Sequence, residues 1–247
     1  MEERKDILLQ IWRACNKGLN HQERYLLLKE AYDDRHMKNY SLLDSATHAK
    51  IYGYFSLVNE IKTVPGDIVE AGVGRGISLS TLAYAVSYLK LDKVIYGFDS
   101  FNGFPVASEK DLGPRVKNIR NVRGWKKTSP EMIYSIFESE NKKSGERNLL
   151  SKNNVTVRLF PGFFDQTIPD HLPKQISLLH MDCDLYDSYR IVFQHCLPRM
   201  CQGGVVVFDE YGDSRWPGAT KAVDEACQEY GLQLLYFEPL KRYMVKT

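Results

Sequence analysis

The sequence has no long apolar run and no cysteine motif that would hold zinc. Its longest apolar stretches, such as Gly203 to Phe208, are far shorter than the ~20 residues of a membrane span. Residues Met1 to Asp6 are charged where a secretory signal needs an apolar core, so we expect a cytoplasmic protein. The five cysteines form no Cys-x-x-Cys pair, which favours free thiols over a disulfide framework.

A strong charge of one sign is also missing. The chain has 33 Lys and Arg against 31 Asp and Glu, and this net charge of +2 is too weak to indicate a nucleic-acid partner. Internal repeats and low-complexity tracts are absent as well. With 43% hydrophobic residues among 247, the chain can bury the core of one domain, with or without a helical extension.

Strand and helix signals alternate along most of the chain. Apolar residues three and four apart predict helices from Ile7 to about Tyr32 and from about Ser45 to Ile61. Further helices are predicted at about 77–89, from Thr128-Ser-Pro-Glu to about Ser139, and at about 219–229. Seven strands are predicted at 67–71, 93–98, 155–160, 176–181, 204–208, 232–237 and 243–246. This alternation predicts an α/β fold with a mostly parallel sheet covered on both faces.

The last two strands are an exception to the parallel pattern. The link that begins at Glu238 is too short for a parallel crossover, so these strands should form an antiparallel hairpin.

The sharpest local signal is a glycine-rich turn between the first strand and a helix. An open parallel sheet has its ligand crevice at this turn, where glycine lets the backbone come close to a ligand. The spacing is GxGxG rather than the GxGxxG of a pyrophosphate-binding turn, because position 77 is Ile. The acid before the turn suits a cationic ligand such as the aminoacyl sulfonium end of S-adenosylmethionine; a purely structural turn is the alternative. The residues concerned are Glu70, Gly72, Gly74, Gly76 and Ser78.

A second acid ends the next predicted strand. Asp99 follows the glycines by about one βα unit, where its carboxylate can accept hydrogen bonds from the ribose hydroxyls of a nucleotide. An isolated Asp at a strand end is more often a turn cap. Ser100 and Phe101 would then border the ribose and adenine. The loop with Gly162 and Phe163 could close over the adenine, although its phenylalanines could equally belong to the core.

Two more predicted strands end in acids. Asp182 follows the strand at 176–181, and Asp209 and Glu210 follow the strand at 204–208. If these strands are parallel neighbours, their carboxylates meet at the edge that holds the glycine turn, where like charges raise one another's pKa. A divalent cation removes this conflict, and ligands that are all oxygen favour Mg²⁺. Asp184, Asp187 and Asp213 could instead simply cap turns and helices.

This arrangement suits the transfer of a methyl group to an oxygen. A cation chelated by vicinal hydroxyls of the substrate would orient one oxygen and lower its pKa. Asp182 or His180 could then accept the proton. A histidine on a core strand is, however, more often a structural residue.

Five consecutive motifs resemble those of the macrocin/mycinamicin sugar O-methyltransferases. They are Ile68-Val-Glu-Ala-Gly-Val-Gly-Arg-Gly, Phe98-Asp-Ser-Phe-Asn-Gly-Phe-Pro, Gly162-Phe-Phe-Asp-Gln-Thr-Ile-Pro, Leu179-His-Met-Asp-Cys-Asp-Leu-Tyr-Asp-Ser and Gly203-Gly-Val-Val-Val-Phe-Asp-Glu-Tyr-Gly. Together they span roughly residues 40 to 230 in the order found in the family. The combination is far more specific than any one motif.

The resemblance implies a class I methyltransferase fold, Rossmann-like, with a seven-stranded mostly parallel sheet and an antiparallel C-terminal strand. It implies S-adenosylmethionine as methyl donor, Mg²⁺, and a sugar hydroxyl as acceptor. By this likeness Asp182, Asp209 and Glu210 fall at the metal positions. The family usually has two successive aspartates where this chain has Asp209 and Glu210, so its use of metal is open at this point.

The acceptor and the assembly are less constrained. A nucleotide sugar, a surface glycan and a natural-product glycoside are all compatible acceptors. The segment from Arg115 to Lys127 contains no acid, and it is either a solvated loop or part of a lid (about 105–150) that meets a phosphate-bearing substrate. We expect a homo-oligomer, a dimer or higher, in which residues 1–62 form a helical extension before the catalytic domain at 63–247. This extension would cover the active site or form the dimer contact.

Two alternatives compete with this interpretation. A nicotinamide-dependent sugar oxidoreductase or epimerase would need GxGxxG and usually a Tyr-x-x-x-Lys pair, and neither is evident. A catalytically silent protein with the same fold, serving as a binding partner, would bind no donor or would show no metal effect.

Overall fold

The structure, a computed structural model, describes residues 45–113, 128–138 and 155–247. The helices predicted between Ile7 and Tyr32 lie outside the described residues, as do the basic segment from Arg115 to Lys127 and most of the expected lid. Within the described part, no helix combines the length and the hydrophobicity that a membrane crossing requires.

The described residues form a sheet of seven strands flanked by six α-helices. The strands are β1 (Asp67–Ala71), β2 (Ile95–Asp99), β3 (Val157–Pro161), β4 (Ile176–Met181), β5 (Met200–Phe208), β6 (Leu235–Phe237) and β7 (Arg242–Lys246). The helices are α4 (Ser45–Glu60), α5 (Ile77–Tyr88), α6 (Pro130–Glu138), α8 (Phe164–His171), α9 (Tyr186–Cys196) and α10 (Pro217–Tyr230).

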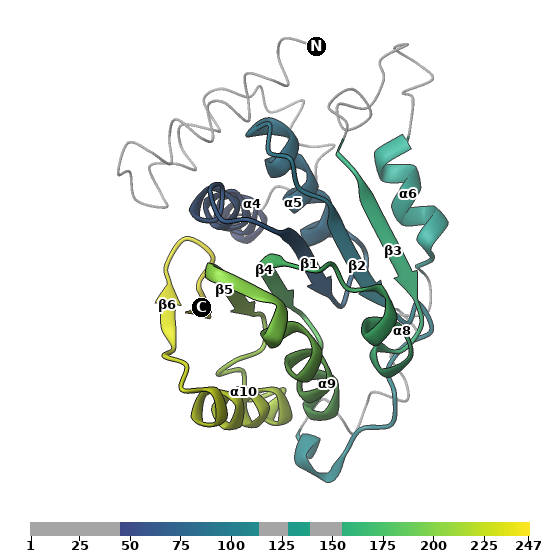
Figure 1. Cartoon of the computed structure of the whole chain (residues 1–247). Helices are drawn as coiled ribbons and strands as arrows, with labels where there is room; N and C mark the ends of the chain where they lie inside the picture. The colour runs from purple at the N-terminus through teal and green to yellow at the C-terminus, as the bar shows by residue number, and fades with distance from the viewer. Residues whose placement is uncertain (1–44, 114–127, 139–154) are drawn as a thin grey trace.

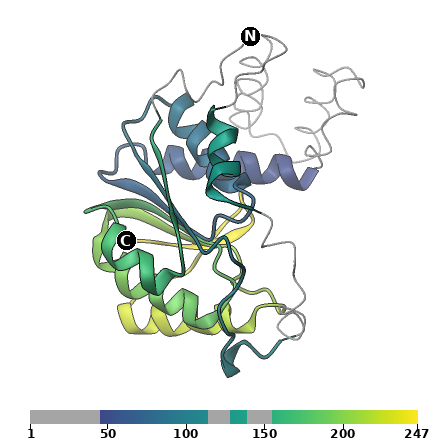
Figure 2. The same ribbon diagram turned by 90° about the vertical axis from the view of Figure 1, so that its right-hand side faces the viewer.

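The sheet has the strand order β3-β2-β1-β4-β5-β7-β6 (Figure 1). The pairs among the first five strands are parallel, whereas β7 runs antiparallel to both β5 and β6. The predicted seven-stranded sheet with an antiparallel C-terminal strand is therefore confirmed. Helices cover both faces, which gives three layers in the view from the side (Figure 2).

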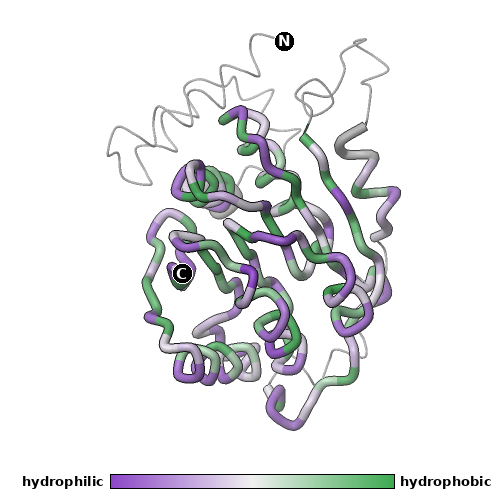
Figure 3. Tube along the Cα trace, in the orientation of Figure 1, coloured by the Kyte–Doolittle hydropathy of each residue, from purple (hydrophilic) through white to green (hydrophobic). Residues whose placement is uncertain are grey.

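The two faces of the sheet have separate hydrophobic cores. One core packs the sheet against α8, α9 and α10, and the other packs it against α4, α5 and α6. Val69 and Ala71 of β1 belong to the first core, and Ile68 belongs to the second, as the alternation of side chains along a strand requires. Figure 3 shows hydrophobic residues gathered along the central strands, as expected for parallel strands buried on both faces.

Two helices were absent from the sequence prediction, whereas α4 lies where a helix was predicted. The segment after β3 was predicted as a loop, but Phe164 already begins α8, a short helix that contains Pro169. Helix α9 was not predicted, although the parallel pair β4 and β5 needs a crossover of this kind. Helix α4 buries Tyr54 and Leu57 in the core that it shares with α5. A domain boundary at residue 62 stays a prediction.

The carboxyl ends of β1 and β4 come close together at Gly72. The Gly72 N–H donates to the Phe98 carbonyl (2.8 Å), and the Asp182 N–H donates to the Ala71 carbonyl (2.9 Å). Gly72 has a φ of 93°, and a Cβ added there would lie 1.8 Å from the Asp182 carbonyl oxygen. Only glycine lets the strand ends approach this closely, and the approach brings the glycine turn beside Asp182.

We expect Gly72→Ala to lower the free energy of unfolding by about 3 kcal/mol or more. The left-handed φ costs about 1–2 kcal/mol, and displacing the carbonyl of Asp182 costs a further 1–3 kcal/mol or so. Gly231→Ala is the matched control, because Gly231 also has a positive φ (65°) but would place its Cβ more than 4 Å from any atom outside its own neighbourhood. Urea unfolding measures both variants. Equal losses would contradict the close approach of the two strand ends.

Candidate active site

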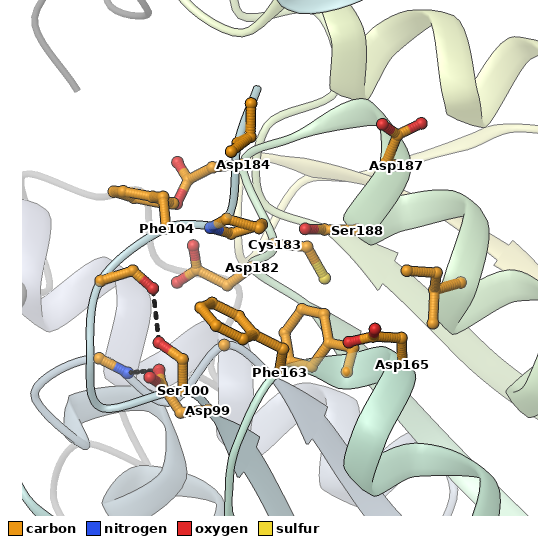
Figure 4. A pocket seen from close by; sticks show the side chains of 17 residues that line it. Asp99, Ser100, Phe104, Phe163, Asp165, Asp182, Cys183, Asp184, Asp187 and Ser188 are labelled. Carbon is orange, nitrogen blue, oxygen red and sulfur yellow. Dashed lines mark hydrogen bonds between the residues drawn. The ribbon is translucent and has the colours of Figure 1, made fainter. Parts of the chain in front are cut away.

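A cavity of about 380 Å³ opens at the carboxyl edge of the sheet. Its wall comes from the turn after β1, the loop after β2, the start of α8, the loop after β4 and the first half of α9. Figure 4 shows Asp99, Phe163 and Asp182 among the side chains around this cavity. A pocket of this size at the carboxyl ends of parallel strands is typical of a ligand site in an open α/β sheet.

Asp99 binds the glycine turn directly. One carboxylate oxygen, Oδ2, accepts hydrogen bonds from the N–H groups of Val73 (2.9 Å) and Gly74 (2.8 Å). The other, Oδ1, accepts one from the Phe101 N–H (2.7 Å). The carboxylate therefore stabilises the shape of the turn. Oδ1 has a second lone pair, so it can accept a further hydrogen bond from a ligand.

The loop after β2 forms one wall of the cavity. Phe104, Pro105 and Val106 line it, and Val106 is 91% exposed. The loop is anchored by Asp111, which is buried and which the sequence analysis did not identify. Its Oδ1 accepts a hydrogen bond from the Tyr186 N–H at the start of α9 (2.7 Å), and its Oδ2 accepts two from Ser108.

The pattern Ser-x-x-Asp at 108–111 is a capping box, so the sequence did contain the signal for this anchor.

Three carboxylates meet on the α9 side of the strand ends. Asp182, Asp184 and Glu210 each offer an oxygen, and these oxygens lie within 4.8 Å of one another. The Tyr189 hydroxyl holds Glu210 by donating to Oε2 (2.6 Å). Burial and the neighbouring Asp209 raise the pKa of Asp182 to about 6. Burial and the nearby Asp182 also raise the pKa of Glu210 well above its usual value.

Asp209 lies outside this cluster. Its Oδ1 accepts a hydrogen bond from Arg242 Nε (2.9 Å) in an ion pair. Burial raises the pKa of Asp209, but the ion pair with Arg242 outweighs burial and holds the pKa below its usual value. Asp209 was expected beside Asp182 and Glu210 as a metal ligand, but the third carboxylate near these two is that of Asp184. A metal-binding role for Asp209 stays a prediction.

His180 belongs to a buried network rather than to the cavity wall. Its Nδ1 lies 2.8 Å from Glu70 Oε1, and its Nε2 lies 3.1 Å from the Tyr54 hydroxyl. Burial lowers the pKa of His180, but the hydrogen bond with Glu70 and the nearby acids outweigh burial and raise it. With 1% of its surface exposed and both ring nitrogens engaged, His180 does not line the cavity. The role of His180 as a proton acceptor stays a prediction.

Glu70 is fully buried in the same network and does not line the cavity. Its Oε2 has no hydrogen-bond partner among the described residues. The expected contact between Glu70 and a cationic ligand therefore stays a prediction.

Some of the remaining predicted residues line the cavity, and others lie in the elements that carry the lining residues. Gly72, Gly74, Ser100 and Phe163 line the cavity together with Asp99 and Asp182. Three others support it: Gly76 begins α5 with a φ of 75°, Ser78 is buried in that helix, and Phe101 packs against the core. The φ of Gly162 is 145°, and the residue turns the chain into α8. Sequence reasoning missed Phe104, Cys183, Ser188 and Ile191 as lining residues, because they lie in loops or on the unpredicted α9.

Comparisons with known proteins give a consistent result. A family model described as macrocin O-methyltransferase (TylF) matches residues 50–238. The chain is 28% identical over 173 residues to mycinamicin III 3''-O-methyltransferase of Micromonospora griseorubida, covering 68% of the chain and 63% of the relative. It is 30% identical over 164 residues to demethyldecarbamoylnovobiocin O-methyltransferase of Streptomyces niveus, covering 66% of the chain and 58% of the relative.

The matched part of the chain spans between 54% and 63% of the length of the curated relatives.

Solved structures support the fold. The O-methyltransferase NovP superposes with a TM-score of 0.64 at 23% identity, covering 82% of this chain and 81% of NovP. The calicheamicin methyltransferase CalS11 superposes with a TM-score of 0.63 at 21% identity, covering 100% of this chain and 93% of CalS11.

The raised pKa of Asp182 predicts a dependence of stability on pH. Folding raises the pKa of this carboxyl from 3.8 to about 6. The protonated carboxyl is therefore favoured in the fold, and its stabilising contribution is complete below about pH 4 and lost as the pH rises through about 6. In the presence of a chelator, we expect Asp182→Asn to raise the free energy of unfolding by about 1–3 kcal/mol at pH 8, and to have little effect near pH 4.

Asp187→Asn is the control for this measurement, because Asp187 lines the same cavity but is exposed to solvent. Denaturant unfolding at both pH values gives the comparison. A destabilising effect of Asp182→Asn at pH 8 would show that the carboxylates do not repel one another as described.

Proposed function

The chain belongs to the macrocin O-methyltransferase (TylF) family, and from this membership we propose that it is an S-adenosylmethionine-dependent O-methyltransferase acting on a sugar hydroxyl. The observation that carries the proposal is the cavity between the glycine turn with Asp99 and the carboxylates at the ends of β4 and β5. One side of this cavity suits a nucleoside donor, and the other suits a polyhydroxyl acceptor. The names of the relatives, which are O-methyltransferases of mycinamicin III and of demethyldecarbamoylnovobiocin, support the same reaction class.

The donor side depends on the backbone of the glycine turn. S-adenosylmethionine, when bound, supplies an electrophilic methyl group on a sulfonium. Gly72 and Gly74 give the ligand access to the backbone without side chains in the way. Asp99 holds this turn, and its Oδ1 offers an acceptor for a ribose hydroxyl. Phe163, on the cavity wall, offers an apolar surface for the adenine ring.

The acceptor side suits a divalent cation. Asp182, Asp184 and Glu210 present only hard oxygen ligands, and their proximity creates a like-charge conflict that a cation would relieve. We propose Mg²⁺ at this position, held by Asp182 and Glu210, with Asp184 as the third carboxylate near these two. Such an ion, when bound, would orient vicinal hydroxyls of the acceptor and lower the pKa of the one that reacts.

Asp182 is the proposed proton acceptor. It lines the cavity beside the glycine turn, so its carboxylate lies next to the proposed donor site, where the reacting hydroxyl would be. The acceptor itself is a sugar carried by a nucleotide, a glycan or a natural product. A phosphate-bearing sugar would also fit the basic segment from Arg115 to Lys127, which lies outside the described residues.

The test of the proposed function begins with donor binding. We expect S-adenosylhomocysteine to raise the melting temperature of the protein while NAD⁺ does not, because a ligand that binds only the folded state stabilises it. The release of S-adenosylhomocysteine is then measured with a panel of nucleotide sugars and glycosides, with and without a chelator. Stabilisation by NAD⁺ alone would contradict the proposal, and donor binding without turnover on any acceptor would favour a silent binding protein.

Asp99 gives a sharper test of the donor site. We expect Asp99→Asn to weaken the binding of S-adenosylhomocysteine roughly 10- to 100-fold, because hydrogen bonds to a charged group contribute about 1.5–3 kcal/mol. The matched control is Asp165→Asn, since Asp165 lines the same cavity but is exposed to solvent. Titration calorimetry measures both dissociation constants. The donor would have to lie elsewhere if the two variants bound it equally well.

A further inference from the structure

The loop after β2 runs along the cavity as a strap, residues 100–111, that is held at both of its ends. Three apolar residues of the strap line the cavity: Phe104, Pro105 and Val106. The first end is held by Asp99, whose carboxylate accepts a hydrogen bond from the Phe101 N–H (2.7 Å). The other end is a 3₁₀ turn, Glu109–Asp111, in which Asp111 is buried. The position of this wall therefore depends on what Asp111 contacts.

Asp111 joins the strap to α9. The Tyr186 N–H at the start of α9 donates to Asp111 Oδ1 (2.7 Å). The first N–H groups of a helix have no partner within the helix, and the N-cap residue of α9, Leu185, has no polar side chain to bind them. The first half of α9 also carries Asp187 and Ser188, which lie across the cavity from the strap (Figure 4). One hydrogen bond thus connects two walls of the cavity.

A second helix leaves room for the same carboxylate. Gly218 lies in the first turn of α10, and a Cβ added there would lie 1.9 Å from Asp111 Oδ1 and 3.0 Å from the Cβ of Tyr186. Just after the strap, a Cβ added at Gly113 would lie 2.8 Å from Cδ of Pro217. Asp111 is therefore at the N-termini of two helices, where the helix dipoles favour a negative charge. Only a residue without a side chain fits at position 218.

Two weaker contacts hold the strap on the same helices. Lys110 Nζ lies 3.8 Å from the centre of the Tyr186 ring, in a cation–π contact. The Phe104 ring lies 6.0 Å from the ring of Trp216, the N-cap residue of α10. Asp111, by contrast, is 1% exposed, and its two oxygens accept three hydrogen bonds. Asp111 is therefore the main attachment of the strap to the helices.

We propose that Asp111 is a positioning residue for the methyl donor, because it joins the strap to α9 and so sets the width of the cavity before a ligand binds. This inference rests on the proposed function, which supplies the ligand. Asp111 does not line the cavity, so it acts through the strap and α9 and not by contact. When the joint is broken, the strap can move away from α9, and only the molecules with a closed cavity bind the donor at full strength.

The test measures the dissociation constant of S-adenosylhomocysteine by titration calorimetry. We expect Asp111→Ala to bind it roughly 10- to 100-fold more weakly than the wild type, because the apparent affinity falls with the fraction of closed molecules. Asp111→Asn keeps an oxygen that can accept from the Tyr186 N–H, so its affinity should lie between those of the wild type and Asp111→Ala. An Asp111→Asn variant as weak as Asp111→Ala would show that the bond to Tyr186 is not the joint.

Gly218→Ala disturbs the joint from the other helix. Its methyl group takes the place of Asp111 Oδ1, so we expect roughly 10-fold weaker binding, although Ala is the better residue for a helix. The double variant Asp111→Ala with Gly218→Ala should bind within about threefold of Asp111→Ala alone, because the carboxylate that the methyl group displaces is then absent. Losses that simply add would show that the two residues act independently, and the proposal would fail.

Ser177→Ala is the matched control for lost stability. Ser177 is fully buried in β4, and its hydroxyl contacts Lys93 Nζ (3.0 Å) and the Gly66 carbonyl (3.1 Å). It lies at the amino end of its strand, whereas the cavity lies at the carboxyl edge of the sheet. We expect this variant to be less stable but to bind S-adenosylhomocysteine within about twofold of the wild type. Circular dichroism melting compares the stability of all the variants.

The outcomes separate this inference from the proposed function. If the wild type binds S-adenosylhomocysteine and Asp111→Ala binds it equally well, the role of Asp111 is overturned and the donor site stands. If Ser177→Ala loses as much affinity as Asp111→Ala, the loss reflects general destabilisation, and the role is likewise overturned. If the wild type binds no S-adenosylhomocysteine, the proposed donor fails, and the inference fails with it.

Discussion

The close approach of β1 and β4 at their carboxyl ends determines the rest of the site. Gly72 has no side chain and a positive φ, so the glycine turn can lie against the backbone of Asp182. This contact brings a turn that has no side chains at Gly72 and Gly74 beside a strand end that carries a carboxylate. Asp99 completes the arrangement from β2, because it binds the same turn from the other side. A cavity with the glycine turn on one side and acidic side chains on the other is the direct result.

Crowding of negative charge is the second constraint. Four carboxylates follow the ends of β4 and β5, and their negative charges are accommodated in different ways. Asp209 is paired with Arg242, Glu210 accepts a hydrogen bond from Tyr189, and Asp182 has a pKa raised to about 6. Such a cluster of like charges opposes folding near neutral pH. We interpret the cluster as a site prepared for a cation and for a proton from the acceptor.

Much of this arrangement could be predicted from the sequence because it depends on local patterns. The alternation of strand and helix patterns predicted the sheet. The glycine spacing and the acids at the ends of three strands predicted the edge of the sheet at which the site lies. The interactions that depend on distant partners could not be predicted. The contacts of the two His180 nitrogens with Tyr54, 126 residues away, and with Glu70 are of this kind. The pairing of Asp209 likewise depends on the register of a strand that begins 33 residues later. Helix α8 was missed because a proline lies inside a short polar segment.

The most direct measurement of the central claim is a crystal structure of the protein with S-adenosylhomocysteine and Mn²⁺. We predict that the ribose binds at Asp99, that the homocysteine part lies along Gly72 and Gly74, and that the anomalous signal of Mn²⁺ appears beside Asp182 and Glu210. A nucleoside bound away from the carboxyl edge of the sheet, or a cavity filled by the protein itself, would contradict the account.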